Sequence, residues 1–347
     1  YVKGIREEYK HLRERHLAKK EDKVLLSIEK ARKNKEMVAW DHKLIQPTFL
    51  GIKTFSNFDL GTLREYIDWT PFFITWQLIG NYPKIFENEK IGTEAKKLFA
   101  DAQIMLDKII KEKWLTANGI VGFWPANATA NDSIEVYENE NRNKTLCQLH
   151  HIRQQKIKAE GQPNFCLSDF IAPKESGRKD YIGGFAVTTG LGCDERAKQF
   201  EKNLDDYSSI MVKALADRLA EAFAEKLHHM VRKELWGYAS NENLNNEDLI
   251  NEKYQGIRPA PGYPACPEHT EKGTLFQLLQ AEKNVGIKLT ENFAMYPAAS
   301  VSGWYFSHPQ SHYFAVGEID KDQVADYAIR KNMTVEEATK WLRPLLS

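Results

Sequence analysis

The chain has 347 residues, of which 42% are hydrophobic and 28% are charged. Lys plus Arg and Asp plus Glu number 48 each, so the net charge at neutral pH is zero, which argues against a broad electrostatic surface for nucleic acid. No apolar run approaches the roughly 20 residues that span a bilayer, and no apolar stretch follows the first basic residues as a secretion signal requires. These features predict an ordinary soluble globular protein with a substantial core.

The four cysteines, Cys147, Cys166, Cys193 and Cys266, show no CxxC spacing. This pattern argues against a zinc ribbon and a disulfide framework, and we expect a reducing, cytoplasmic location. Because no ligand spacing typical of a metal site is present, we expect no metal on this chain. The sequence begins with Tyr1 instead of Met, and we expect a fragment of a longer protein.

The N-terminal third mixes charged helix-forming segments with shorter extended ones. Residues 4–36 are dense in Lys, Arg and Glu and predict a solvated helix or helix pair. Residues 41–58 predict an extended segment with loops, and the aromatic stretch 68–73 is expected to be partly buried. Apolar residues at helical spacing predict a helix over 93–114.

The middle of the chain combines short apolar strands with one long helix. Strands are predicted over 119–127, 134–137 and 181–187, and residues 145–154 are compatible with a strand or a short helix. Apolar side chains keep helical spacing through residues 206–235, which predicts the longest helix.

The C-terminal part begins with a loop-rich stretch, residues 237–272. A helix over 274–284 is expected to stop at Gly286, since glycine readily adopts the left-handed conformation that ends helices. Successive strands with short turns are predicted over 289–296, 300–306 and 313–318.

Two capped helices are predicted at the end of the chain. Asp320 can cap a helix over 324–329, and Thr334 with Glu337 forms a capping box for the last helix. Helices followed by a strand meander indicate an α+β fold with an antiparallel sheet. A doubly wound nucleotide-binding fold would require repeated βα units and a Gly-rich first turn, and neither is visible in the sequence.

The most unusual segment is residues 258–269, RPAPGYPACPEH. Its four prolines exclude a helix and a central strand, so a rigid extended loop is predicted. Such a loop holds Arg258 and Tyr263 in fixed places, and an Arg suits a carboxylate ligand gripped bidentately. The alternative is a structural wrap whose Arg pairs with an internal Asp, and composition alone does not decide between the two.

Other candidate ligand contacts are isolated in the sequence. Asp68 precedes an aromatic run, and Glu221 lies beside the apolar stripe of the long helix, where it faces either a cleft or solvent. In Tyr313-Phe314, strand alternation would send one ring to the core and the other toward a ligand. Covalent catalysis by Cys266 is not favoured because no base stands at a set spacing from it.

Five long motifs stand out along the chain: YIDWTPFF (66–73), ADRLAEAFAE (216–225), WGYASNENL (236–244), GIRPAPGYPACPEHTEK (256–272) and SGWYFSHP (302–309). In sequence and in order they resemble one known family, the C-terminal reactivation domain of cobalamin-dependent methionine synthase. The resemblance covers the chain from about residue 20 to its end.

This resemblance implies a single C-shaped α+β domain, an antiparallel sheet flanked by helices, that binds S-adenosylmethionine. Residues 1–20 would be the linker from a preceding cobalamin-binding domain, and residues 21–347 the reactivation domain. Such a domain presents S-adenosylmethionine for the reductive methylation of inactive cob(II)alamin, which restores the methylcobalamin used in methionine biosynthesis.

The resemblance also implies a ligand site. Asp68 would meet the amino group of the ligand, and Arg258 would hold its carboxylate. The remaining positions carried over from the family are Glu221, Glu252, Ala260, Gly262, Tyr263, Tyr313 and Phe314. An ammonium, a carboxylate and a sulfonium call for an acid, an Arg, and an acid or aromatic face, respectively.

Motifs that the family places elsewhere are not found in this sequence. The Asp-x-His-x-x-Gly motif that binds cobalamin and the zinc-thiolate set for homocysteine are missing, so cobalamin and zinc are expected on other domains. The expected partners are the cobalamin-binding domain of the same polypeptide and a flavodoxin-type electron donor. We expect a monomer that does not make methionine by itself.

Two other functions remain open from the residues. A self-sufficient S-adenosylmethionine-dependent methyltransferase would transfer methyl groups without added cobalamin, but its Gly-rich turn is not found. A pure interaction domain would dock a protein through the proline-rich loop and the aromatic segment, and S-adenosylmethionine would not stabilise it.

Overall fold

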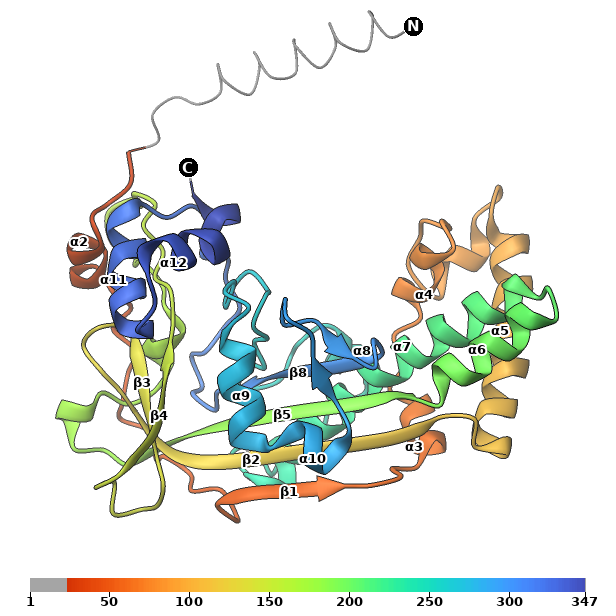
Figure 1. The fold of residues 1–347 in the computed structure, drawn as a ribbon, viewed down its shortest axis with the longest axis horizontal. Coiled ribbons are helices and arrows are strands. Elements are labelled where there is room, and N and C mark those ends of the chain that lie inside the picture. Colours follow the sequence, from red (N-terminus) through yellow and green to blue (C-terminus); the bar gives the residue numbers. More distant parts are fainter. Residues whose placement is uncertain (1–23, 347) are drawn as a thin grey trace, which may run out of the picture.

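The computed structural model describes residues 24–346. Figure 1 shows a C-shaped molecule in which two arms rise from the ends of a central sheet. One arm contains strands β3 and β4 with helices α2, α11 and α12, and the other contains α4, α5, α6 and the start of α7. The predicted C-shaped α+β architecture is therefore confirmed.

The central sheet is antiparallel at every pairing, in the order β4-β3-β2-β5-β8, and β1 also pairs with β2. The two longest strands, β2 and β5, run side by side and are buried along almost their whole length. The strands are β1 (Gly51–Phe55), β2 (Thr116–Ala128), β3 (Ser133–Tyr137), β4 (Thr145–His150), β5 (Asp180–Leu191) and β8 (Ser300–Tyr305).

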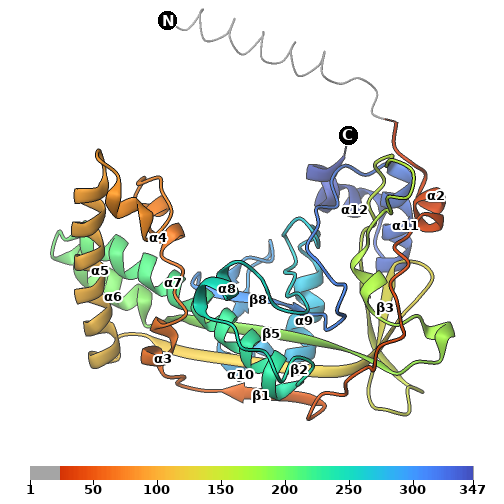
Figure 2. The ribbon, with the colours of Figure 1, turned by 180° about the vertical axis from the view of Figure 1, so that it is seen from behind.

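One face of the sheet packs against the helical arm. Alternate side chains of β2 and β5, such as Phe123 and Phe185, pack with the apolar face of α7 in one core. Figure 2 shows the molecule from this side, with α7 and α8 in view. The predicted long helix is confirmed, and Val231–Leu235 extends it as a π-helical turn. Ile210 is one of the apolar residues in this predicted span, but it is 49% exposed. The helices of this layer are α3 (Leu60–Arg64), α4 (Thr70–Thr75), α5 (Gly92–Glu112), α6 (Cys193–Lys202) and α7 (Asp206–Met230).

The opposite face of the sheet is covered by the segment that follows the long helix. Ile120, Ala186 and Trp304 point to this side and form a second core with α9 and α10. The helix predicted over 274–284 is broken in two because Gln280 adopts a left-handed conformation with φ of 49°. Gly286 ends the second piece with φ of 77°, as expected. The helices on this face are α9 (Glu271–Leu279) and α10 (Ala281–Val285), whereas α8 (Asn246–Ile250) lies on the side of α7 (Figure 2).

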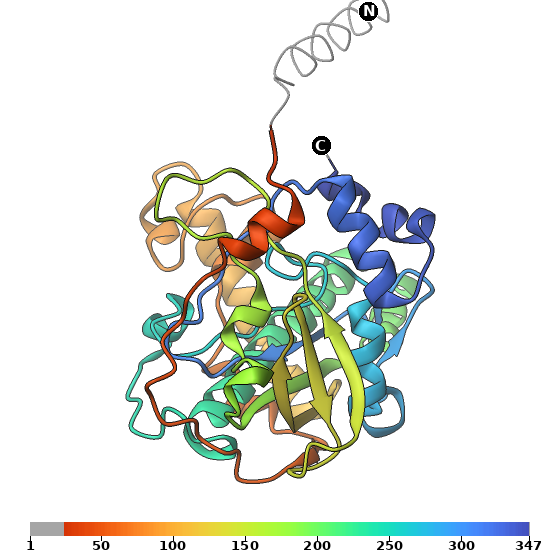
Figure 3. The ribbon, with the colours of Figure 1, turned by 90° about the vertical axis from the view of Figure 1, so that its left-hand side faces the viewer.

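The last two helices lie against the N-terminal part of the described chain. Asp320 caps α11 (Lys321–Lys331), and the capping box of Thr334 and Glu337 begins α12 (Val335–Leu342), both as predicted. Figure 3 shows α2 (Ile28–Lys33) near these helices, above the yellow strands. The part of the predicted N-terminal helix before residue 24, and the linker predicted at residues 1–20, lie outside the described residues. The described residues also include four 3-10 turns: Lys84–Glu87, Leu167–Phe170, Lys174–Ser176 and Arg343–Leu345.

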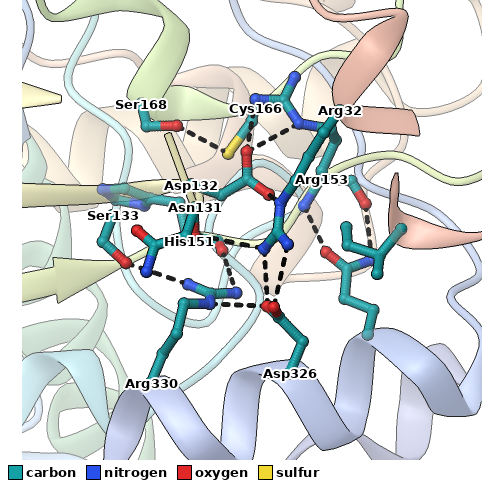
Figure 4. Close-up of polar contacts among 12 residues, drawn as sticks. Arg32, Asn131, Asp132, Ser133, His151, Arg153, Cys166, Ser168, Asp326 and Arg330 are labelled. Atoms are coloured by element: carbon teal, nitrogen blue, oxygen red, sulfur yellow. Dashed lines mark hydrogen bonds and ion pairs between the residues drawn. The ribbon is translucent and has the colours of Figure 1, made fainter. Parts of the chain in front are cut away.

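A largely buried chain of alternating charges holds α2 in place within the arm that contains β3 and β4 (Figure 4). Each carboxylate in it accepts hydrogen bonds from at least one guanidinium at 2.6–3.0 Å. Charges taken out of water are tolerated only when they are paired in this way. The chain runs Arg330, Asp326, Arg32, Asp132, Arg153, Asp169.

Two predicted strands differ in the structure. Residues 289–296 form only the two-residue strands β6 (Lys288–Leu289) and β7 (Met295–Tyr296), which pair in a separate hairpin. Residues 313–318 form no strand because they do not pair with β8. Residues 257–259 form the backbone hydrogen bonds along the outer edge of β8 at residues 304–306 instead. Isolated contacts hold this segment instead, such as the Val316 N–H to the Pro264 carbonyl.

His151 is a buried side chain that gives the fold a predictable response to acid. It is 2% exposed, and neither ring nitrogen has a hydrogen-bond partner within residues 24–346. Burial, together with the nearby charges of Arg330 and Lys331, lowers the pKa of His151 to about 3. The unfolded chain therefore binds a proton at this residue below about pH 6.5, and the folded chain does not.

We predict that His151 makes the free energy of unfolding fall by about 2 kcal/mol between pH 7 and pH 5. A His151→Phe variant should lose this part of the pH dependence, since an aromatic ring still packs beside Phe306. Urea unfolding of both proteins at the two pH values measures the difference. An unchanged pH dependence in the variant would show that the ring is already charged when folded.

Within residues 24–346, no helix has both the length and the apolar character needed to cross a membrane.

Candidate functional site

A cavity of about 560 Å³ lies along the outer edge of β8, between this strand and the proline-rich loop. Its walls come from α7, from residues 252–265, from β7 and β8, and from residues 313–314. Seven of the nine predicted site residues line it: Glu221, Glu252, Arg258, Ala260, Tyr263, Tyr313 and Phe314. The structure thus brings together residues that are up to 93 positions apart in the sequence, from 221 to 314.

The proline-rich loop forms a compact turn at the mouth of this cavity. The Gly262 N–H donates to the Cys266 carbonyl at 2.7 Å, and the Tyr263 N–H donates to the Ala260 carbonyl at 3.1 Å. Gly262 has φ of 97°, a conformation that L-residues with a side chain rarely adopt. The turn leaves Tyr263 63% exposed above the cavity, where its ring is available to a ligand.

Arg258 is held from inside the protein. One Nη forms an ion pair with Glu225 Oε2 at 2.7 Å, and the other lies 3.2 Å from His228 Nδ1. Burial, together with the charges of Arg232 and Arg258, lowers the pKa of His228 well below its usual value, so the neutral ring can accept this bond. The sequence left open whether Arg258 pairs with an acidic residue inside the protein. It does so in the structure, and the acid is Glu225 instead of the expected Asp.

This ion pair does not use all the donors of Arg258. Its side chain is 19% exposed, it lines the cavity, and its Nε–H makes no hydrogen bond within residues 24–346. Although burial opposes the charge, Glu225 raises the pKa of Arg258, so the guanidinium stays charged. An oriented cation with an unused donor can still bind a carboxylate in the cavity.

Two carboxylates face the same cavity. Glu221 projects from α7, and Glu252 stands on the loop after α8 in a left-handed conformation with φ of 54°. Burial raises the pKa of both, and the positive charge of Arg258 opposes the rise. A cationic group on a ligand would stabilise their ionised forms, so the site suits a molecule that carries both a carboxylate and positive charge.

The aromatic side chains lie at the rim. The Tyr313 hydroxyl accepts a hydrogen bond from the Arg258 backbone N–H at 2.9 Å, which ties this segment to the loop. Phe314 is half-buried and packs against the second core. Tyr313 and Phe314 were expected to face opposite ways, but both line the cavity because the segment is not a strand.

Comparison with known proteins identifies the family. Residues 59–332 match the family described as "Vitamin B12 dependent methionine synthase, activation domain". The chain belongs to this family. It is also similar to a solved structure described as the MetH reactivation domain bound to AdoHcy, with 57% sequence identity and a TM-score of 0.90. The match covers 93% of this chain and 99% of that one.

The chain is therefore a reactivation domain of the B12-dependent methionine synthase type, as the sequence motifs indicated. A self-sufficient methyltransferase is not favoured by this membership. The match leaves the individual ligand contacts to be argued from the geometry of this chain.

Asp68 and Gly262 are the two predicted site residues that do not line the cavity. The Asp68 carboxylate accepts a hydrogen bond from the Thr70 N–H at 2.9 Å, at the start of α4. This places it on the helical arm (Figure 1), and its contact with the amino group of the ligand stays a prediction. Gly262 does not line the cavity, but its positive φ allows the turn of the loop that does.

Sequence reasoning missed several cavity residues, among them Lys272, Met295, Ser300 and Ser302. Lys272 is 8% exposed and donates to the Phe293 carbonyl at 2.8 Å, and burial lowers its pKa. Lys272 and Ser302 lie within the family motifs. The sequence pattern of these motifs does not distinguish residues that line the cavity from residues that are buried in the core. Met295 and Ser300 carried no signal, because the turn that presents them depends on tertiary packing.

We predict that Gly262→Ala destabilises the protein by about 1–3 kcal/mol and weakens ligand binding. An added Cβ would meet His269 Cε1 at 2.5 Å, so either the His269 ring or the loop would have to move. Gly161→Ala is the matched control, since Gly161 also has positive φ but no atom within 4 Å of the added Cβ. Thermal unfolding measures the stability of both variants. The loss in Gly161→Ala reports the cost of placing a side chain at positive φ, and any additional loss in Gly262→Ala reports the contact with His269. Equal losses of stability would show that the surroundings of residue 262 accommodate the added Cβ freely.

Proposed function

We propose that this chain binds S-adenosylmethionine in the cavity along β8 and presents its methyl group to a cobalamin held by another domain. The observation that carries the proposal is a cavity with one oriented arginine and two carboxylates, in a chain 57% identical to a domain solved with AdoHcy. AdoHcy is S-adenosylmethionine without the methyl group, so one site suits both molecules.

The charges of the cavity suggest how the ligand is oriented. The carboxylate of its amino-acid part would meet Arg258, and its positive groups would lie near Glu221 and Glu252, with Asp68 approaching from the helical arm. Tyr263 and Tyr313 offer aromatic faces to the sulfonium. The role of the chain in methyl transfer would then be to bind and position the ligand.

The proposed partners are the cobalamin-binding domain of the same polypeptide and a flavodoxin-type electron donor. Cobalamin and zinc would be held by other domains, and we propose a cytoplasmic location and a monomeric state for this chain. S-adenosylmethionine supplies the methyl group, cobalamin accepts it, and the donor supplies the electron that restores activity. The chain alone would not make methionine from homocysteine.

Calorimetric titration tests the binding step. We expect S-adenosylmethionine and S-adenosylhomocysteine to bind and to raise the unfolding temperature. 5′-Methylthioadenosine, which lacks the amino-acid part, should bind far more weakly because it offers nothing to Arg258. Absence of binding by all three would contradict the proposal, and equal binding by all three would remove Arg258 from it.

A reconstitution tests the presenting role. The chain is mixed with the separate cobalamin-binding domain carrying cob(II)alamin, with reduced flavodoxin and S-adenosylmethionine labelled on its methyl group. Label should appear on cobalamin only when the chain is present. Label on cobalamin at the same rate without the chain would contradict the presenting role.

A further inference from the structure

Helix α7 and the π-helical turn that extends it carry a stripe of polar residues that leads from the cavity into the protein. Its members recur every three or four residues and therefore share one face of the helix. They are Glu221, Glu225, His228 and Arg232. Glu221 lines the cavity, whereas Glu225 is 7% exposed and Arg232 is fully buried. The charges of the cavity thus continue behind its wall.

The guanidinium of Arg232 is held at one edge and on one face. Its Nε and Nη2 donate to the Glu242 carboxylate at 2.9–3.0 Å, and its Cζ lies 4.2 Å from the centroid of the Tyr254 ring. The Tyr254 hydroxyl in turn lies 3.5 Å from one Nη of Arg258. The buried arginine and the cavity arginine therefore contact the same tyrosine.

One nitrogen of Arg232 is not used by these contacts. Its Nη1 has no hydrogen-bond partner within residues 24–346, and neither has Oε1 of Glu225, although both atoms are buried. The two atoms lie 3.8 Å apart, which is too far for a hydrogen bond but close enough for their charges to attract. Because buried polar groups are almost always paired, this gap indicates a contact that forms in another state of the protein.

Binding of a carboxylate at the cavity would change the balance around Glu225. Its Oε2 pairs with Arg258 at 2.7 Å, and its Oε1 is the atom nearest to Arg232. A ligand carboxylate at Arg258 would draw on the same positive charge and so weaken the hold of Arg258 on Glu225. A carboxylate as buried as Glu225 requires a compensating cation, and the unused nitrogen of Arg232 is within reach.

We propose that Arg232 is a positioning residue for binding of the ligand carboxylate. When Arg258 binds this carboxylate, Nη1 of Arg232 closes on Oε1 of Glu225 and compensates part of its charge. Arg232 keeps its contact with Glu242 and moves across the face of Tyr254, since attraction to a ring face does not depend on a single pair of atoms. This rests on the proposed function and adds to it a residue outside the cavity that favours ligands with a carboxylate.

Titrations of the whole chain with two ligands test this exchange. The ligands are S-adenosylhomocysteine and its decarboxylated analogue, which ends in an aminopropyl group and differs only in the carboxylate. Arg232→Lys keeps a positive charge beside Glu242 but removes the unused nitrogen. It should weaken binding of S-adenosylhomocysteine about tenfold, as expected for one hydrogen bond between charged groups, and binding of the analogue less than about twofold. Equal weakening of both ligands, or weakening of neither, would overturn the proposal.

Arg153→Lys is the matched control for this variant. Arg153 is also buried and also pairs with carboxylates, but it lies among the charges that hold α2. This control should lower the unfolding temperature, as Arg232→Lys does, and bind both ligands as the wild type does. A tenfold loss of affinity for S-adenosylhomocysteine in the control would show that affinity follows the stability of the fold, which would overturn the role of Arg232.

The wild type offers a second measurement that needs no variant. In crystals grown without and with S-adenosylhomocysteine, the distance from Arg232 Nη1 to Glu225 Oε1 should shorten from 3.8 Å to about 3.0 Å. An unchanged distance in the complex would overturn the proposal, and this comparison decides if Arg232→Lys does not fold. If the wild type binds neither ligand, the proposed function itself fails. Binding of S-adenosylhomocysteine without the exchange removes this inference alone.

Discussion

Arg258→Ala should weaken binding of S-adenosylmethionine by about 30- to 150-fold, which corresponds to roughly 2–3 kcal/mol. The variant removes the oriented cation that the cavity offers to a carboxylate. Arg258 owes its orientation to Glu225 and His228, which contact it from α7. Titration calorimetry on the wild type and the variant measures the difference directly.

The same variant should also be less stable, because it leaves the Glu225 carboxylate buried. Glu225 Oε1 already has no hydrogen-bond partner within residues 24–346, and the other nearby cation, Arg232, lies 3.8 Å away. Breaking a buried ion pair by removing one partner costs about 3–5 kcal/mol. The titration is therefore run well below the unfolding temperature of the variant.

Arg258→Lys distinguishes the two effects. A lysine keeps a positive charge near Glu225 but cannot form the forked contact with a carboxylate. We expect it to recover much of the stability and little of the affinity. If either variant bound S-adenosylmethionine as tightly as the wild type, Arg258 would be a structural residue only.

Arg153→Met should destabilise the fold by about 3–5 kcal/mol. Figure 4 shows this side chain among the charges that hold α2 within the arm containing β3 and β4. Arg153 is 2% exposed and pairs with Asp132 and Asp169, whose side chains are 1% and 5% exposed. Methionine has a similar length but would leave both carboxylates without this partner.

Arg64→Met is the matched control for this experiment. Arg64 also donates to a carboxylate at 2.6 Å, but its side chain is 38% exposed and that of Asp107 is 64% exposed. An exposed pair of this kind contributes about 0–1 kcal/mol. Urea unfolding at neutral pH compares the two variants, and a loss of similar size in both would mean that the buried charges are individually dispensable.

The sequence predicted best the elements whose signal is local. The helix over 206–235 was found because its buried side chains, such as Leu215, Leu219 and Phe223, keep one spacing over many turns. The end of α10 at Gly286 and the caps of the last two helices were found because single residue types favour those positions.

The failures have a common physical cause. Residues 313–318 look like a strand, but a strand needs a free edge, and residues 257–259 already occupy that of β8 where pairing is possible. Glu225 was not singled out because its partner, Arg258, lies 33 residues away in the sequence. Contacts between residues far apart in the sequence depend on how the helices and the sheet pack together. A local sequence pattern carries no information about that packing.

The candidate site divides in the same way. The loop residues Arg258, Ala260 and Tyr263 were predicted through a run of prolines and a family motif, and they do line the cavity. Met295 and Ser300 also line the cavity and were not predicted, because only the packing of the chain places them there.

A crystal structure of this chain grown with S-adenosylhomocysteine tests the central claim most directly. We predict that the ligand occupies the cavity along β8, with its carboxylate at Arg258. A ligand bound elsewhere on the molecule, with the cavity empty at saturating concentration, would contradict the account.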